Sequence, residues 1–176
     1  MILGAILAGG QSRRFGRDKA LAELGGQTLL ARAVDALAPL CDAVVVVGRS
    51  VAPAPTLPDW PGPGMGPLGG IAAALHHATD AGYDAVLTCA VDSVGVGEGL
   101  LADLSPAPAY SADQPVIGLW PASATAILDA LLEGDGRRSM RVFAEAIGAR
   151  AVTLSCPPAN INTLEDLAAA ERRHGL

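Results

Sequence analysis

Aromatic residues and positive charge are both scarce in this sequence. Only six of its 176 residues are Phe, Tyr or Trp, and 12 Lys and Arg stand against 18 Asp and Glu, for a net charge of −6. An acidic chain without a basic stripe is not typical of a nucleic-acid-binding protein, because neutralising phosphates requires clustered Lys and Arg. With so few aromatic side chains, the core must be built from Ala, Val, Leu and Ile, which favours close packing of helices on a sheet.

Cysteines and long apolar segments are also rare. Cys41, Cys89 and Cys156 are widely spaced and form no C-x-x-C pair, so the sequence predicts neither a disulfide framework nor a zinc site. The apolar start, residues 1–8, is too short to cross a bilayer, and the arginines follow it instead of preceding it. We therefore expect no signal peptide and no membrane anchor, and a reduced, cytoplasmic protein.

Length and composition predict one folded domain. Hydrophobic residues make up 51% of the chain and charged residues 17%, which excludes an intrinsically disordered chain or a coiled coil. A chain of this length buries roughly 70% of its unfolded surface without disulfides or metals. We therefore expect a single domain over residues 1–176.

Apolar runs alternate with helical patterns along the chain. Continuous apolar runs, typical of strands covered on both faces, predict strands at 2–7, 43–47 and 84–89. Apolar residues at helical spacing predict helices at 28–40 and 67–79. Weaker patterns predict helices at 98–104, 122–133, 138–147 and 164–174 and strands at 108–111, 115–119 and 151–154. This alternation predicts an α/β fold, a three-layer α/β/α sandwich with a mainly parallel, Rossmann-like central sheet and ligands at the carboxyl ends of its strands.

The segment that follows the first strand is the most informative. Residues 7–19 read LAGGQSRRFGRDK, with paired glycines followed by four cations. Paired glycines let the backbone approach a ligand and aim N–H groups at anionic oxygens, and the cations can neutralise a polyphosphate. The spacing matches neither a P-loop nor the dinucleotide-binding G-x-G-x-x-G. We interpret the segment as a phosphate-binding loop, and the alternative is a surface turn with solvated arginines.

Four motifs together resemble one known family, the molybdenum cofactor guanylyltransferases or MobA family. Residues 7–19 match its L-A-G-G-x-S-x-R-x-G-x-D-K signature, and residues 66–70, which read GPLGG, resemble its G-P-L-A-G helix start. Residues 115–120 resemble its H-P-x-x-x-L segment, and residues 160–167 its N-x-N-T-P-E-D-L ending. The resemblance implies an enzyme that transfers GMP from GTP to the terminal phosphate of Mo-molybdopterin, forming molybdopterin guanine dinucleotide and releasing pyrophosphate.

The same resemblance implies that the first loop wraps the triphosphate of GTP. The residues along the nucleotide would be Leu7, Ala8, Gly9 and Gly10. Lys19 would contact the phosphates, and Arg13 would stabilise charge on the leaving pyrophosphate. Attack at the α-phosphorus shifts charge onto the departing oxygens, so cations held there act most strongly in the transition state.

Two carboxylates complete the implied donor site. Asp59 matches the family's nucleotide contact, with an ordinary turn aspartate as the alternative. Asp92 follows the third strand in register with the family's metal carboxylate, where it would hold Mg²⁺ and act in catalysis with Lys19 and Arg13. The Cys and Pro that flank this Asp in the family are replaced by Val91 and Val94, so we expect a loop of different shape.

The acceptor side departs from the family's pattern at Gln114 and in the loop at residues 109–113, which looks shorter than in typical members. Asn160 and Asn162 would face the pterin by resemblance, with loop and cap hydrogen bonding as the alternative. The family's His before the conserved Pro is Gln114 here. Besides GTP and Mo-molybdopterin, the resemblance implies transient contacts with molybdenum-cofactor synthesis proteins or with the apo-enzymes that receive the cofactor.

Two further functions stay open on the sequence. Residues 47–49 read Val-Gly-Arg where the family carries an Asn near the base, which leaves cytidylyl transfer to molybdopterin, or nucleotidyl transfer to another small phosphate, as an alternative. The altered loop at residues 91–94 leaves a non-catalytic nucleotide- or cofactor-binding relative as the other. His76 and His77 are interpreted as packing or surface residues, not ligands.

Overall fold

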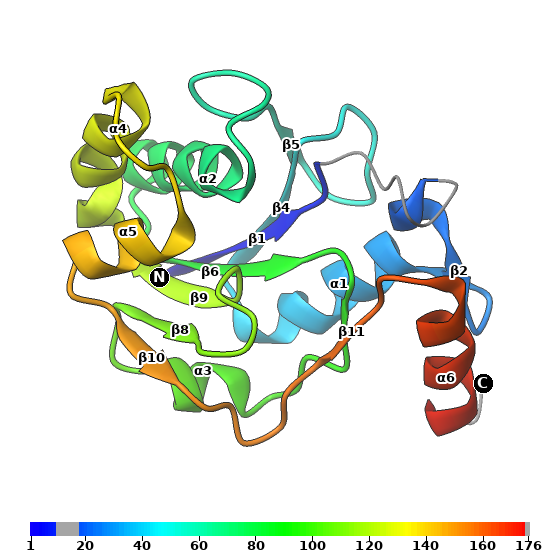
Figure 1. Cartoon of the computed structure of the whole chain (residues 1–176). Helices are drawn as coiled ribbons and strands as arrows, with labels where there is room; N and C mark the ends of the chain where they lie inside the picture. The colour runs from blue at the N-terminus through cyan, green and yellow to red at the C-terminus, as the bar shows by residue number, and fades with distance from the viewer. Residues whose placement is uncertain (10–17, 175–176) are drawn as a thin grey trace.

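A seven-stranded sheet forms the centre of the molecule (Figure 1). The computed structural model describes residues 1–9 and 18–174 of the chain. The strands, in the spatial order β10-β8-β9-β6-β1-β4-β5, are Arg150–Val152, Ala109–Ser111, Gly118–Pro121, Ala85–Ala90, Ile2–Leu7, Ala43–Val47 and Thr56–Leu57. β9 pairs antiparallel with both β6 and β8, and the other described pairs of this sheet are parallel. The prediction of a mainly parallel sheet is confirmed.

Helices cover both faces of the sheet, as a three-layer fold requires (Figure 1). One face packs against α2 (Pro67–Ala81), α4 (Thr125–Glu133) and α5 (Met140–Ala146), and the other against α1 (Leu29–Leu37) and α3 (Leu100–Leu104). The last helix, α6 (Leu164–His174), lies beside a small hairpin of β2 (Glu23–Leu24) and β3 (Gln27–Thr28). Single-turn 3₁₀ helices are η1 (Lys19–Leu21), η2 (Ala38–Leu40) and η3 (Ala122–Ala124).

Local sequence explains where the main helices begin and end. The Thr28 side chain accepts a hydrogen bond from the Ala31 N–H and caps α1, while Pro39 falls in the 3₁₀ turn that closes it. The helix α2 begins with Pro67 in its first turn and ends at Gly82, whose φ of 79° is the left-handed conformation of a helix C-cap. These signals confirm the predicted starts of both helices.

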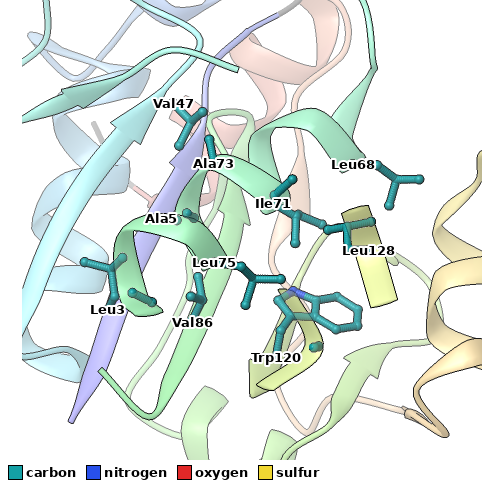
Figure 2. Close-up of a cluster of buried hydrophobic side chains, with 14 of the residues drawn as sticks. Leu3, Ala5, Val47, Leu68, Ile71, Ala73, Leu75, Val86, Trp120 and Leu128 are labelled. Carbon is teal, nitrogen blue, oxygen red and sulfur yellow. The ribbon is translucent and has the colours of Figure 1, made fainter. Parts of the chain in front are cut away.

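Alternation along the strands supplies two apolar cores, one for each face. On β1, Leu3 and Ala5 pack into the α2 side, whereas Ile6 packs into the α1 side. Figure 2 shows the first of these cores, in which the buried Trp120 lies with the aliphatic side chains of α2 and the sheet. The indole N–H of Trp120 donates to the buried Thr88 hydroxyl at 2.8 Å, which satisfies both polar groups.

A third, smaller core ties the C-terminal segment to the start of the chain. It contains Ala22, Leu24, Leu29, Ile161, Leu167 and Ala170. A two-stranded ladder of β7 (Ser93–Val94) and β11 (Ala159–Asn160) lies beside it, and Val94 packs against it. This core therefore holds residues 159–162 against the loop after β6.

The structure corrects two of the strand predictions. The strand expected at 115–119 is β9, Gly118–Pro121, because the preceding residues close a turn in which the Ile117 N–H donates to the Gln114 carbonyl at 2.8 Å. The strand expected at 151–154 is β10, Arg150–Val152. The segment between β4 and α2, for which no strand was predicted, contains the edge strand β5. Among the described residues, no helix combines the length and the apolarity needed to span a membrane.

Substitution of Gly118 tests the packing of the first core. A Cβ at Gly118 would overlap the Trp120 indole, so Gly118→Ala is expected to lower the free energy of unfolding by about 1–3 kcal/mol. Urea denaturation measures the loss, with Gly97→Ala as the matched control, since a Cβ at Gly97 would meet open space. Equal stability of the two variants would contradict the described packing of Trp120.

Candidate active site

A cavity of about 960 Å³ opens at the carboxyl ends of β1, β4 and β6. These strands are neighbours in the sheet, so the loops that follow them meet at one edge. The cavity is lined by residues of these three loops, of the segment between β5 and α2, of the start of α2 and of the turn before β9, and by one residue near the C-terminus. The polar side chains among them are Asp18, Lys19, Asp59, Asp92 and Asn162.

Lys19 lies at the centre of the polar groups. Its ammonium donates to Asp92 Oδ2 at 2.6 Å and to Asn162 Oδ1 at 3.1 Å. The Lys19 and Asp92 side chains are only 12% and 20% exposed, so the pair is held largely away from water. Lys19 is also the only lysine in the sequence. One cation therefore joins the loop after β1, the loop after β6 and the segment that precedes α6.

A second ion pair anchors the backbone that carries Lys19. The Arg49 guanidinium donates to both carboxylate oxygens of Asp18, at 3.0 and 2.6 Å, and Asp18 Oδ1 also accepts from the Ala20 N–H. The hydrogen bond from Arg49 lowers the pKa of Asp18. Because Arg49 follows β4 and Asp18 precedes η1, this bidentate pair holds the Lys19 turn against the neighbouring strand end.

Asp59 lies at the other end of the cavity, in a recess walled by glycines. A Cβ placed on Gly9, Gly48 or Gly70 would lie 3.6 to 3.7 Å from one of its carboxylate oxygens. Gly48 has a φ of 85°, and a Cβ there would lie 2.7 Å from Gly9 Cα, so this close approach of two loops requires glycine. Burial raises the pKa of Asp59, and no hydrogen bond joins its carboxylate to another residue in the described ranges. Asp59 is one of the polar residues that line the cavity.

The loop that carries Asp92 is closed by the C-terminal segment. The Ile161 N–H donates to the Asp92 carbonyl at 3.0 Å, and Asn160 pairs with Ser93 in the β7–β11 ladder. Val94, which stands where the family's Pro was expected, packs into the third core. The altered loop is thus held by β pairing and apolar contact.

The structure brings most of the predicted site residues together. Those that line the cavity are Leu7, Ala8, Gly9, Lys19, Asp59, Asp92 and Asn162. Asn160 is exposed in β11 and is not among the lining residues. Gly10 and Arg13 lie outside the described residues.

Comparison with known proteins identifies the family. The sequence model of the family described as the MobA-like NTP transferase domain matches residues 4–151. The chain belongs to this family. A curated molybdenum cofactor guanylyltransferase of Rhodobacter capsulatus is 43% identical, over 98% of this chain and 96% of its own, and one of Acidiphilium cryptum is 37% identical, over 94% and 92%.

Solved structures show the same fold. The molybdopterin-guanine dinucleotide biosynthesis protein A of Archaeoglobus fulgidus has a TM-score of 0.73 at 24% identity, covering 98% of each chain. The α/β nucleotidyltransferase fold expected from the sequence is therefore confirmed.

Sequence reasoning missed two residues of this MobA-like site. Arg49 entered only as a departure from the family, although its place after β4, next to β1, was enough to bring it near the Lys19 turn. Gly70 was noted as part of a helix start, but a Cβ on it would lie 2.9 Å from Leu7 Cδ2, so it also lets α2 approach β1. The first could be found from strand adjacency, whereas the second depends on how α2 sits on the sheet.

The raised pKa of Asp59 predicts that its carboxylate lowers the stability of the folded protein while it favours ligand binding. Its raised pKa means that the folded protein binds a proton there more tightly than the unfolded chain, so the ionised carboxylate lowers stability at neutral pH. Asp59→Asn is expected to raise the free energy of unfolding at neutral pH and to weaken nucleotide binding. The gain in stability should shrink as the pH falls through the raised pKa, because the wild-type carboxyl is then also neutral.

Urea denaturation at neutral pH and near pH 4, with Asp80→Asn on the exposed surface of α2 as the charge-matched control, measures this effect. A loss of stability in Asp59→Asn at neutral pH would show instead that the carboxylate makes a favourable contact in the free protein.

Proposed function

We propose that this chain transfers GMP from GTP to the terminal phosphate of Mo-molybdopterin, yielding molybdopterin guanine dinucleotide and pyrophosphate. The observation that carries the proposal is the position of Lys19, whose ammonium touches both Asp92 and Asn162 inside a cavity that also holds Asp59. Family membership and the activity in the names of the two curated relatives support the same reaction.

The Asp59 end of the cavity suits a guanine base. An ionised carboxylate has two oxygens that only accept hydrogen bonds. Guanine offers adjacent N–H donors at N1 and N2, so both could bind Asp59, whereas cytosine presents one amino donor beside acceptors that a carboxylate repels. Asp59 can therefore supply the base contact that Val47 cannot make. Gly9, Gly48 and Gly70 place no side chain beside the Asp59 carboxylate.

The residues of the site fit Mg²⁺ only together with a polyphosphate. No group of three or more His, Cys, Asp and Glu side chains gathers within the described ranges. Asp18 also lines the cavity but is paired with Arg49, so Asp92 is the carboxylate that the site offers to a metal beside Lys19. Mg²⁺ is commonly held by one or two carboxylates plus substrate phosphates. At Asp92 it would neutralise charge on the α-phosphate of the donor. We propose this metal dependence on the chemistry of the donor set.

The reaction needs positioning and electrostatics more than a protein nucleophile. An oxygen of the acceptor phosphate forms a bond to the α-phosphorus of GTP, the bond to the bridging α–β oxygen breaks, and pyrophosphate leaves with the electron pair. Lys19 is released from Asp92 as the phosphates arrive and binds their oxygens, where it is most effective as charge moves to the leaving group. Arg13 is proposed to act beside it.

The acceptor is proposed to enter on the Asn162 side of Lys19. Asn162 both lines the cavity and touches Lys19, so a phosphate bound there would lie next to the transferring group. We propose that Asn160, on the outer edge of the same segment, contacts the rest of the pterin ligand. A cytoplasmic location and transient contacts with synthesis proteins or recipient apo-enzymes complete the proposal.

Turnover and nucleotide binding test this function. GTP with Mg²⁺ at about a hundred times its Kd is expected to stabilise the fold by about 2.7 kcal/mol, with a smaller effect for ATP, CTP and UTP. With molybdopterin present, pyrophosphate release should follow the same order. Lys19→Ala is expected to lower kcat/KM at least a hundredfold, because a donor to the developing charge is lost. Arg172→Ala, which removes an exposed positive charge on α6, is the control.

Three outcomes would contradict the proposal in different ways. A preference for CTP would favour the cytidylyl alternative. Nucleotide binding without pyrophosphate release would favour a non-catalytic relative. Wild-type turnover in Lys19→Ala would exclude the proposed role of the ammonium.

A further inference from the structure

Gln114 links the loop that carries Asp92 to the segment that carries Asn162, although it does not line the cavity. Its side chain accepts a hydrogen bond from the Ser93 hydroxyl at 3.2 Å and donates to the Pro158 carbonyl at 2.7 Å. Ser93 follows Asp92 directly, and Pro158 precedes the strand that leads to Asn162. The half-buried amide therefore bridges the carboxylate loop and the Asn162 segment.

These two segments already form one unit. Ser93 pairs with Asn160 in the β7–β11 ladder, and the Ile161 N–H donates to the Asp92 carbonyl. Gln114 contacts Ser93 of β7 through its oxygen and Pro158, the residue before β11, through its nitrogen. It thereby connects the whole unit to the turn between β8 and β9.

The turn that presents Gln114 is itself firmly attached to the central sheet. The Gln114 N–H donates to the Ser111 hydroxyl at 3.2 Å, and its carbonyl accepts from the Ile117 N–H. The Thr88 hydroxyl of β6 donates to the Val116 carbonyl at 2.6 Å and is bound in turn by the buried Trp120. The amide thus projects from a turn that is fixed by hydrogen bonds, as expected of a residue that positions other side chains.

The chemistry of the contact explains why an amide occupies this position. One side chain must accept from a hydroxyl and donate to a carbonyl at once, which an amide does with its oxygen and nitrogen. A neutral imidazole also carries one acceptor and one donor, so histidine can make the same pair of bonds. An ionised glutamate can only accept, and it would place a negative charge against the Pro158 carbonyl.

We propose that Gln114 is a positioning residue that sets the separation between Asp92, on the donor side, and Asn162, on the acceptor side. This inference rests on the proposed function, in which the acceptor phosphate must meet the α-phosphate between these two side chains. Asp59, which is proposed to bind the base at the far end of the nucleotide, lies on another element and is not a hydrogen-bond partner of the amide. Gln114 therefore governs the use of the acceptor more than the binding of GTP.

Kinetics of the full chain separate this role from a general structural one. Gln114→Met keeps the length of the side chain and loses both hydrogen bonds; we expect a ten- to hundredfold lower kcat and a higher KM for molybdopterin, with the GTP-induced shift in melting temperature retained. Gln114→Glu should be as impaired as the Met variant, and Gln114→His should recover most of the activity. Gln27→Met, which removes one surface hydrogen bond to Asp35, is the matched control.

Hydrogen–deuterium exchange of the same proteins without substrate gives a readout independent of turnover. Gln114→Met is expected to speed exchange in residues 92–94 and 159–162 at least tenfold, whereas Gln27→Met leaves both segments unchanged. If the wild type made no dinucleotide, the proposed function would fall, and the exchange result would still decide whether Gln114 holds the two segments.

The inference is overturned by unchanged exchange in both segments, by wild-type kinetics in Gln114→Met, or by equal loss of GTP binding and turnover. The last result would make Gln114 a residue of general stability only.

Discussion

The contact between the Lys19 ammonium and the Asp92 carboxylate is the constraint on which the rest of the site depends. Moving two charges largely out of water is costly, and their attraction and the additional bond to Asn162 offset that cost. A polyphosphate with a divalent cation offers each partner a substitute, phosphate oxygens for the lysine and the metal for the aspartate. In the free site the two charges of the pair therefore neutralise each other until a ligand of that chemistry binds.

The fold brings the groups that take part in this exchange of ion-pair partners to one edge of the sheet. β1, β4 and β6 lie side by side, so the Lys19 turn, Arg49 and the Asp92 loop meet at one edge of the sheet. The third core and the β7–β11 ladder then bring the end of the chain to the same edge, where Asn162 reaches Lys19. The proposed donor and acceptor sides thus meet at one cation, although their residues lie far apart in the sequence.

The sequence predicted the sheet and the helices well because long apolar runs and helical spacing are local signals. The strands at 2–7 and 43–47 have the predicted bounds. The two-residue strands β2, β3, β5, β7 and β11 were not predicted, because so short a segment shows no periodicity and its conformation depends on the partner strand. The strand β9 begins later than predicted for a similar reason, because the turn before it is held by Thr88 of β6, which lies far away in the sequence. Motif resemblance grouped Lys19 with Asp92, but the links made by Arg49 and Gln114 depend on where the loops lie in space.

Because Lys19 is the only lysine, its side chain can be observed alone. NMR of protein labelled with ¹³C and ¹⁵N only in lysine gives a single ammonium-bearing side chain, and Asp92→Asn should shift its signal in the free protein. Addition of GTP with Mg²⁺ is predicted to move the wild-type signal in a saturable way, to a position that no longer responds to Asp92→Asn. A signal that stays at its free position in the presence of saturating GTP and Mg²⁺ would contradict the exchange of Asp92 for phosphate, and with it the central claim of the account.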